Sequence, residues 1–238
     1  MSFADSSGRS TLKAAAVLIF DLDGTILSVN SFHFWVLTML IGRFGGLSYG
    51  ERIVLSLRTI RTLVERKLFR KSHSAIRQYL QGAWMDALEK DAGQAALLRL
   101  HEGLRNRIRP NLRNVLDIVA EGKADAVLAT AAAGVYAEGF ALSLGFRHIL
   151  TTDGLSENSG EKKRDRVLSL LADQGLQHRT RIFFTDHEDD LPLIRESHLV
   201  LWFGKYEDMQ RIRKYALDVE IIPCAHLPGN EIIRLLEI

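Results

Sequence analysis

The sequence predicts an α/β fold in which helices cover both faces of a doubly wound, mainly parallel sheet. Short, uninterrupted apolar runs are typical of strands buried on both faces, and helical patterns lie between these runs. Strand and helix alternate in this way from Pro110 to the end of the chain. Segment 30–107 breaks the alternation, because it contains helical patterns and no convincing strand. We therefore expect a Rossmann-like core, 1–29 and 108–238, with an all-helical domain, here called the insert, at 30–107.

Each strand of the core is predicted from one apolar run. The first run covers 14–20 and stops at Asp21. Further runs, in chain order, cover 124–130, 181–186, 198–203 and 219–223, and segment 148–152 is a candidate to pair with these strands. Core helices are expected over 112–119, 135–144, 164–171 and 206–217. Within the insert, apolar residues recur at helical spacing over 53–68, 76–88 and 95–104.

The composition excludes several classes of protein. With 47% hydrophobic and 25% charged residues, the chain of 238 residues has globular proportions. Its single cysteine, Cys224, excludes an intrachain disulfide and a cysteine-based zinc site, and is typical of a reducing compartment. Residues 1–10 have no signal-peptide pattern, and no apolar stretch reaches the ~18 residues of a membrane-spanning helix, so we expect a cytoplasmic protein. The eight histidines lack the spacing of a zinc site.

The strongest chemical signal is the run Asp21-Leu22-Asp23-Gly24-Thr25, directly after the first predicted strand. Ligands of open α/β sheets bind beyond the carboxyl ends of the strands, so we expect both carboxylates at a ligand site. An aspartate carboxylate can attack phosphorus and form an aspartyl-phosphate. A second carboxyl group two residues later can protonate the leaving oxygen and then activate water. The alternative is a pair of aspartates that merely form a turn after the strand.

This run resembles the first motif of the haloacid dehalogenase superfamily of phosphatases, and three further segments match that family in its order. The second motif is a Ser or Thr at the end of the next core strand, and Thr130 matches it. The fourth motif is an acidic pair after a later strand, and Asp186 and Asp190 match it. The resemblance implies that Thr130 binds a phosphate oxygen and that the acidic pair serves a metal.

The third motif of the family is a lysine near the start of a later helix, and Gly-Glu-Lys-Lys at 160–163 matches it. Lys163 is the better candidate and Lys162 the close alternative, while a solvated basic helix face is the competing interpretation. The resemblance implies that this lysine stabilises charge on the transferred phosphate. An all-helical insert between the first and second motifs is similar to the cap of the phosphoserine phosphatase-like subfamily.

The resemblance implies a Mg²⁺-dependent phosphatase that hydrolyses a small phosphomonoester through an aspartyl-phosphate. It implies that Asp21 and Asp23 are catalytic, that Thr130 and Lys163 bind phosphate, and that Asp21, Asp23 and Asp186 bind metal, with Asp190 in support. Phosphotransfer to an alcohol acceptor is one alternative, and a peripheral membrane-surface protein that acts on or binds a phosphorylated lipid is another. His187 and Asp189 stand where relatives commonly carry Ser and Asn, so no relative's substrate preference is carried over.

The net charge of +2 conceals a basic insert. Segment 43–77 has nine Lys or Arg and two acids, whereas the rest of the chain has 22 basic and 27 acidic residues. We favour solvated helix faces as the explanation; attraction of anionic substrates and contact with an anionic membrane surface are the alternatives. The amphipathic segment 51–71 and the unusually apolar run 32–40 are features of helices at a membrane surface. Nucleic acid is not expected as a partner, and no pattern indicates the oligomeric state.

Overall fold

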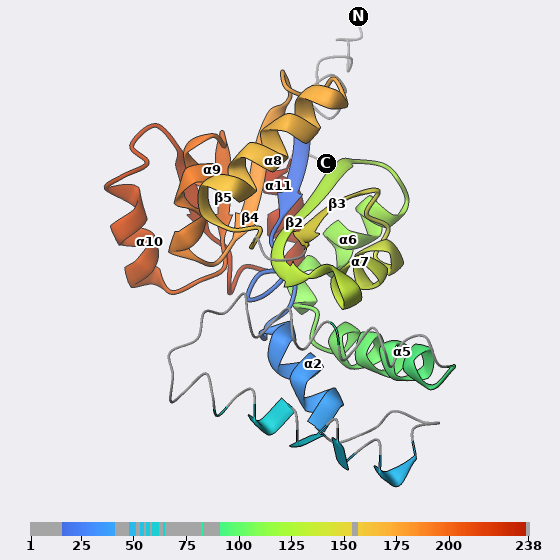
Figure 1. Cartoon of the computed structure of the whole chain (residues 1–238). Coiled ribbons are helices and arrows are strands. Elements are labelled where there is room, and N and C mark those ends of the chain that lie inside the picture. The colour runs from blue at the N-terminus through green and yellow to red at the C-terminus, as the bar shows by residue number, and fades with distance from the viewer. Residues whose placement is uncertain are drawn as a thin grey trace, which may run out of the picture.

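The structure is a computed structural model of the chain (Figure 1). It describes residues 16–40, 91–153 and 157–236 and, between the first two of these ranges, 48–50, 53–54, 56–57, 59–61, 64 and 82. The helical pattern predicted over 76–88 therefore lies, apart from one residue, outside the described residues.

Six strands form one sheet in the order β3-β2-β1-β4-β5-β6. Their bounds are β1 (Ala16–Phe20), β2 (Asp125–Ala133), β3 (His148–Thr152), β4 (Thr180–Thr185), β5 (Leu199–Trp202) and β6 (Glu220–Pro223). All neighbouring strands are parallel, which confirms the predicted fold class. The chain builds β2 and β3 on one side of β1 and then crosses back to place β4 on the other side. Because the strand order reverses between β1 and β4, a ligand site is expected beyond their carboxyl ends.

Successive side chains of β1 face two separate cores, one on each side of the sheet. Leu18 and Phe20 pack into a core with residues of α6, α7 and α11, and Val17 and Ile19 into a core with residues of α8, α9 and α10. The bounds of these helices are α6 (Arg113–Ala120), α7 (Gly134–Ser143), α8 (Gly160–Asp173), α9 (Leu191–Arg195), α10 (Tyr206–Arg213) and α11 (Gly229–Leu235). Since neighbouring side chains point to opposite faces, a strand covered on both sides must be apolar throughout.

The helices differ from prediction mainly at their ends. Helix α8 begins at Gly160 rather than at residue 164, and α10 ends at Arg213 rather than at residue 217. The short helices α9 and α11 and the 3₁₀ turns η2 (Pro110–Leu112) and η3 (Glu188–Asp190) were not predicted. Elements of one or two turns contain too few apolar repeats to produce a helical pattern.

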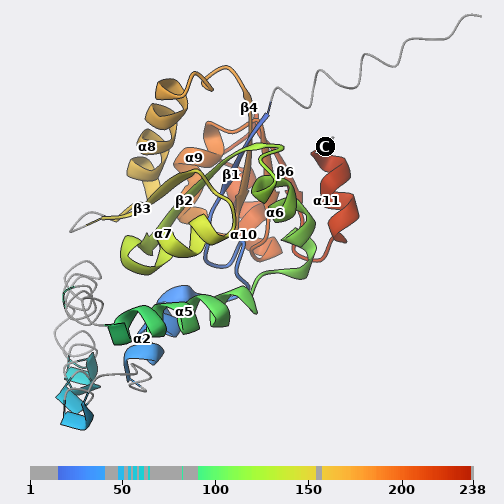
Figure 2. The ribbon, with the colours of Figure 1, turned by 90° about the vertical axis from the view of Figure 1, so that its right-hand side faces the viewer.

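The described residues of the insert include helices and no strand. Its two long described helices, α2 (Ser31–Leu40) and α5 (Asp91–Arg105), lie together beyond the carboxyl ends of the strands (Figures 1 and 2). Trp35 of α2 is fully buried, and its ring centroid lies 5.2 Å from that of Tyr136 in α7. Packing against the core therefore accounts for much of the apolar character of 32–40. No helix in the described part of the chain combines the length and the apolarity needed to cross a membrane.

Two linkers connect the insert to the core, and they are hydrogen-bonded to each other. The Ser28 amide donates to the Arg107 carbonyl over 3.0 Å, and the Arg109 amide donates to the Ile26 carbonyl over 2.9 Å. The chain thus enters and leaves the insert through one paired ribbon, a few residues beyond β1.

Candidate active site

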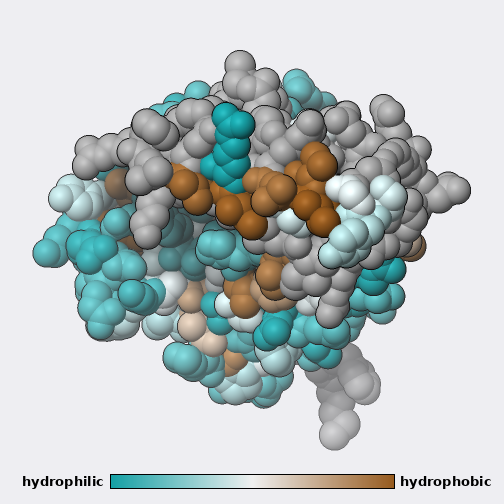
Figure 3. Space-filling model, turned by 60° about the horizontal axis from the view of Figure 1, so that its bottom comes forward, coloured by the Kyte–Doolittle hydropathy of each residue, from teal (hydrophilic) through white to brown (hydrophobic). Residues whose placement is uncertain are grey.

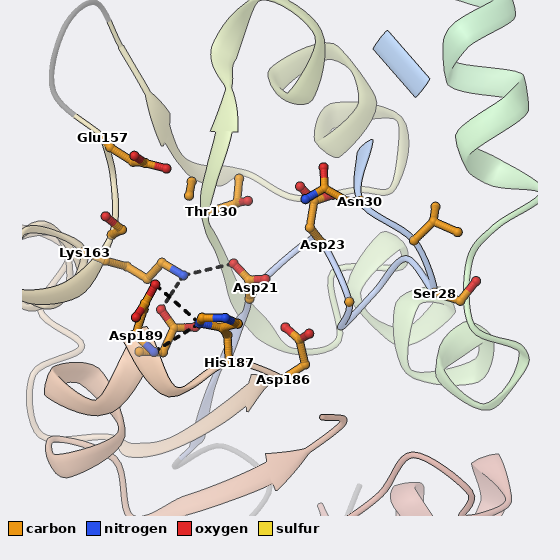
Figure 4. A pocket seen from close by; sticks show the side chains of 15 residues that line it. Asp21, Asp23, Ser28, Asn30, Thr130, Glu157, Lys163, Asp186, His187 and Asp189 are labelled. Atoms are coloured by element: carbon orange, nitrogen blue, oxygen red, sulfur yellow. Dashed lines mark hydrogen bonds and ion pairs between the residues drawn. The ribbon is translucent and has the colours of Figure 1, made fainter. Parts of the chain in front are cut away.

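A cavity of about 590 Å³ lies beyond the carboxyl ends of β1, β2 and β4. All six site residues predicted from the sequence line it, namely Asp21, Asp23, Thr130, Lys163, Asp186 and Asp190. Figure 4 labels all of them except Asp190. Parallel strands place their carboxyl ends at one edge of a sheet, so residues that are distant along the chain meet there.

Lys163 lies on the first turn of α8, and its side chain is 3% exposed. Its Nζ atom is 2.9 Å from Oδ1 of Asp21 (Figure 4) and 2.6 Å from Oδ1 of Asp190. Burial would lower the pKa of Lys163, but Asp190 and Asp21 outweigh it and raise the pKa above its ordinary value. Lys163 therefore carries a charge inside the protein, and it is the lysine of the pair 162–163 that contacts Asp21.

Asp21 directly follows β1, and its amide donates to the Phe184 carbonyl in β4 over 3.0 Å. Its position is therefore set by the sheet, since this bond continues the pairing of β1 with β4. Burial raises the pKa of Asp21 well above its ordinary value; Lys163 opposes this shift, and Asp190 and Asp186 add to it. A mobile loop would not hold a carboxylate in so unfavourable an environment; here the paired backbone does.

Asp186 directly follows β4 and lies against the turn at Gly24. A Cβ atom at Gly24 would lie 1.9 Å from Oδ2 of Asp186, and the φ angle of Gly24 is +75°. Only glycine fits this position, because any other side chain would displace the carboxylate and strain the backbone. The Thr25 hydroxyl donates to Oδ1 of Asp186 over 3.3 Å, so one turn positions both the first and the fourth motif.

Asp190 is the buried partner that completes this group of acids. Its Oδ2 accepts a 2.6 Å hydrogen bond from the Thr185 hydroxyl, while Oδ1 holds Lys163. Burial, with a further contribution from Asp190, raises the pKa of Asp186 to about 6. Asp190 thus orients the lysine and adds negative potential at Asp186.

The acids around Lys163 have the chemistry of a divalent-cation site. Asp21, Asp186 and Asp190 interact with one another and have one buried cation, Lys163, among them. Mg²⁺ prefers such oxygen ligands and usually retains several waters. Among the described residues, no three His, Cys, Asp or Glu side chains are arranged to hold an ion by themselves. The acids therefore fit Mg²⁺ if a main-chain carbonyl, such as that of Asp23, and oxygens of water or substrate complete its coordination.

Asp23 connects the site to the insert. Its Oδ1 accepts a 2.7 Å hydrogen bond from the amide of Ser31, the first residue of α2. The Ser31 hydroxyl in turn lies 2.9 Å from the Tyr136 hydroxyl of α7. Burial raises the pKa of Asp23, whereas the hydrogen bonds from Ser31 lower it. A carboxyl group with a raised pKa is suited to donate a proton.

Thr130 lies in the cavity wall but not at the predicted strand end. Strand β2 continues to Ala133, and its pairing with β3 shifts register between Ala129 and Ala133. The Thr130 hydroxyl accepts a hydrogen bond from the Ala132 amide over 3.1 Å. An irregularity in the strand therefore turns this threonine toward the site, and the apolar run alone could not predict it.

The sequence model of the haloacid dehalogenase-like hydrolases matches residues 18–195, a range that contains all six of these site residues. The chain belongs to this family. The membership confirms the resemblance drawn from the four motifs. No curated protein matches the chain.

Several solved structures share the fold of this chain. A protein of unknown function from Bordetella pertussis has a TM-score of 0.63 at 18% identity, over 88% of this chain and 99% of that one. A probable phosphoserine phosphatase from Vibrio cholerae has a TM-score of 0.61 at 11% identity, over 94% of this chain and 65% of that one. A phosphoserine phosphatase solved as a phospho-aspartyl intermediate analogue has a TM-score of 0.50 at 10% identity, over 92% and 97%.

Arg109 is a residue of the site region that the motifs do not reveal. Its Nη2 and Nε atoms donate to the Gly24 carbonyl over 2.7 and 3.2 Å, and its guanidinium lies 5.6 Å from the centroid of the Phe203 ring. Arg109 belongs to the linker by which the chain leaves the insert, so it fastens that linker to the turn that carries Asp23 and positions Asp186.

Asn158 and His187 complete the surroundings of the site. The Asn158 amide group donates to the carbonyls of Thr130 and Leu150 over 3.1 and 2.8 Å, which holds the irregular part of β2 against β3. His187 is exposed, and its Nδ1 accepts a 3.2 Å hydrogen bond from the Asp189 amide at the start of η3. The described contacts of His187 are thus those of a cap on a short helix.

Proposed function

We propose that the chain is a Mg²⁺-dependent phosphatase that hydrolyses a small phosphomonoester through an aspartyl-phosphate on Asp21. The observation that carries the proposal is the buried Lys163, which contacts both Asp21 and Asp190 beyond β1. A phosphate that enters a cluster of acids needs a cation to offset the repulsion, and Lys163 provides one beside the nucleophile. Membership of the hydrolase family and the phospho-aspartyl analogue of a similar phosphatase support the same chemistry.

In the first step, a carboxylate oxygen of Asp21 attacks phosphorus and the ester P–O bond breaks. Asp23, whose pKa is raised by burial, gives its proton to the departing alcohol oxygen. Lys163 and the Thr130 hydroxyl hold the phosphoryl oxygens during the transfer. The products of this step are the free alcohol and phosphorylated Asp21.

In the second step, water attacks the phosphorus and the bond to Asp21 breaks. The Asp23 carboxylate takes a proton from that water, which restores both aspartates and releases inorganic phosphate. Mg²⁺, when bound, supplies positive charge that draws the phosphate in and stabilises its developing charge. Asp21, Asp186 and the Asp23 carbonyl would hold it, with Asp190 in support.

The insert, over 30–107, is proposed to act as a cap that closes over the cavity and excludes water. Two observations support this role: the paired linkers that join it to the core, and the hydrogen bond from the first residue of α2 to Asp23. The proposed cellular location is the cytoplasm, in keeping with a buried, unpaired Cys224.

Asp21→Asn tests the nucleophile. The variant should release phosphate from an aryl phosphate at least about a thousandfold more slowly in the presence of Mg²⁺, because an amide does not attack phosphorus. Asp173→Asn makes the same chemical change at the exposed end of α8 and should retain the wild-type rate. Thermal unfolding checks that both variants fold, and activity that persists in Asp21→Asn overturns the proposal. Alcohol acceptors added to the same assay distinguish hydrolysis from phosphotransfer, since transfer would produce a new phosphate ester.

A further inference from the structure

One helical segment of the insert has a stripe of apolar side chains on its outer face. Four of its side chains are 42–59% exposed, namely Ile53, Leu57, Ile60 and Val64. Their spacing of three and four residues places them on one face of a helix. Thr59, which that spacing places on the opposite face, is 1% exposed. By sequence, Leu55 and Leu63 share the side of Thr59, so the segment has apolar residues on two sides. A helix on the surface of a globular protein ordinarily has polar residues on its outer face.

These side chains belong to a larger apolar surface, here called the insert patch. Its described members are the four residues of the stripe together with Leu37, Tyr49 and Val54, all of them exposed. Figure 3 shows the molecule from the side of the insert, where hydrophobic side chains form a band across the face. Exposed apolar side chains gathered on one face in this way mark a surface that another molecule covers.

The charge of the sequence around the insert patch indicates which kind of molecule covers it. The sequence segment 53–64 contains Arg58 and Arg61 and no acid, and segment 43–77 has nine basic residues against two acidic ones. A second copy of the chain would bring an equally positive segment against it, which like charges disfavour. Nucleic acid would satisfy the charge but would leave the apolar stripe uncovered. An anionic lipid surface satisfies both, because acyl chains take up the apolar side chains while headgroups pair with the arginines.

We propose that the insert patch docks this protein on an anionic membrane surface, with the helical segment lying in the plane of the headgroups. The sequence suggested such contact partly from 32–40, but α2 buries Trp35 in the core, and the exposed segment is the one that follows it along the chain. The docking does not depend on the phosphatase chemistry, since none of its residues lines the cavity.

Co-sedimentation of the full-length protein with lipid vesicles tests the proposal. Vesicles of phosphatidylcholine with added phosphatidylglycerol should bind the protein, and vesicles of phosphatidylcholine alone should bind it much less. Raising the salt from about 0.05 M to about 0.5 M should release most of it, because screening weakens the attraction of the arginines. The double variant L57E/I60E should partition about tenfold or more weakly, since it removes apolar contact and adds repulsion.

Leu142→Glu combined with Leu217→Glu is the matched control. Both leucines lie on the core and are 63% and 83% exposed, so the control adds the same two charges outside the patch and should bind vesicles like the wild type. Thermal unfolding checks each variant, and Leu57→Gln gives a smaller loss of binding if the double variant does not fold.

Three results would overturn the proposal. The first is no binding to anionic vesicles, or binding that salt does not weaken. The second is an equal loss of binding in the patch variant and in the core control. The third is a dimer in sedimentation velocity that L57E/I60E dissociates while vesicles bind nothing, because the patch would then be covered by a second copy of the chain.

Discussion

At the scale of single residues, Lys163 supplies the positive charge that offsets the buried carboxylates of the candidate site. It contacts two buried carboxylates at 2.9 and 2.6 Å, and each of the three groups would be an isolated charge without the others. Buried charges of this kind are tolerated only while their partners remain. The same cation that we propose for phosphate binding therefore also stabilises the folded protein, because it pairs with both carboxylates.

Lys163→Met removes that cation while keeping a long apolar stem. We expect the free energy of unfolding in metal-free buffer to fall by about 3–5 kcal/mol, because Asp21 and Asp190 lose their partner. Phosphate release should fall in parallel, since the transferred phosphate loses its cation. Urea unfolding and an aryl phosphate assay measure the two effects. Lys162→Met is the matched control and should change stability by less than about 1 kcal/mol; a larger loss of activity in Lys162→Met would reverse the assignment.

The predictable residues of the site are those whose chemistry is visible in a short run of sequence. Asp21, Lys163 and Asp186 each stand at a strand end or a helix start, and parallel topology then brings such ends together. Arg109 and Asn158 were not predicted, because their role lies in contacts with carbonyls far along the chain, at Gly24 and Thr130. A carbonyl acceptor is present at every residue, so no pattern in the sequence identifies the one that a side chain will reach.

At the scale of secondary structure, helix α5 of the insert packs against helix α7 of the core. His101 of α5 lies with Nε2 2.8 Å from the Tyr136 carbonyl of α7, and its ring packs against Phe140 at a centroid distance of 5.7 Å. A carbonyl only accepts, so Nε2 is the protonated nitrogen. Burial lowers the pKa of His101, with a smaller contribution from Arg105, while the bond to Tyr136 opposes the shift. The folded protein therefore prefers a neutral His101.

This preference predicts a pH dependence of stability. Because the unfolded chain binds a proton at His101 more readily, the contribution is fully present above the unfolded pKa of about 6.5 and is lost as the pH falls through the lower folded pKa. His101→Gln keeps a donor for the Tyr136 carbonyl. In this variant the midpoint temperature of thermal unfolding should fall less than in the wild type as the pH is lowered from neutral to acidic values. His226→Gln, at an exposed position, should leave the curve unchanged. An identical pH dependence in wild type and His101→Gln would contradict the prediction.

The strands and helices differ in how well their positions can be predicted from the sequence. A strand covered on both faces must be apolar at every position, and apolar runs located β1, β2, β4 and β5 in this way. Strand β3 is different, because its sequence HILTT is partly polar and it was expected only as a segment that could pair with the others. The end of β2 was misplaced, because its irregular register depends on Asn158 and β3 rather than on its own residues. Helices α9 and α11 were missed for a different reason, since five to seven residues contain too few repeats for a pattern.

At the scale of the whole molecule, the segment by which the chain leaves the insert is fastened near the centre of the sheet and at one of its edges. Arg109 donates to the Gly24 carbonyl after the central strand β1. Asn111 donates through Nδ2 to the carbonyls of Cys224 and Leu227, over 3.1 and 3.0 Å, after the edge strand β6. The C-terminal segment therefore belongs to the same unit as the site and the root of the insert, and we expect it to open only when that unit unfolds.

The reactivity of the Cys224 thiol measures how readily the C-terminal segment opens. The Cys224 side chain is fully buried and burial raises its pKa to about 12, so the thiol is shielded and un-ionised in the native state. Since the thiolate is the reactive form, a thiol reagent at pH 8 should label the native protein only at the rate of unfolding, and urea should accelerate labelling in step with the loss of structure. Asn111→Ala removes two hydrogen bonds to this segment and should label about tenfold faster. Leu217→Cys, at an exposed position, should react at once and shows that the reagent is active. Rapid labelling of Cys224 in native wild type would show that β6 and α11 open separately from the rest of the molecule.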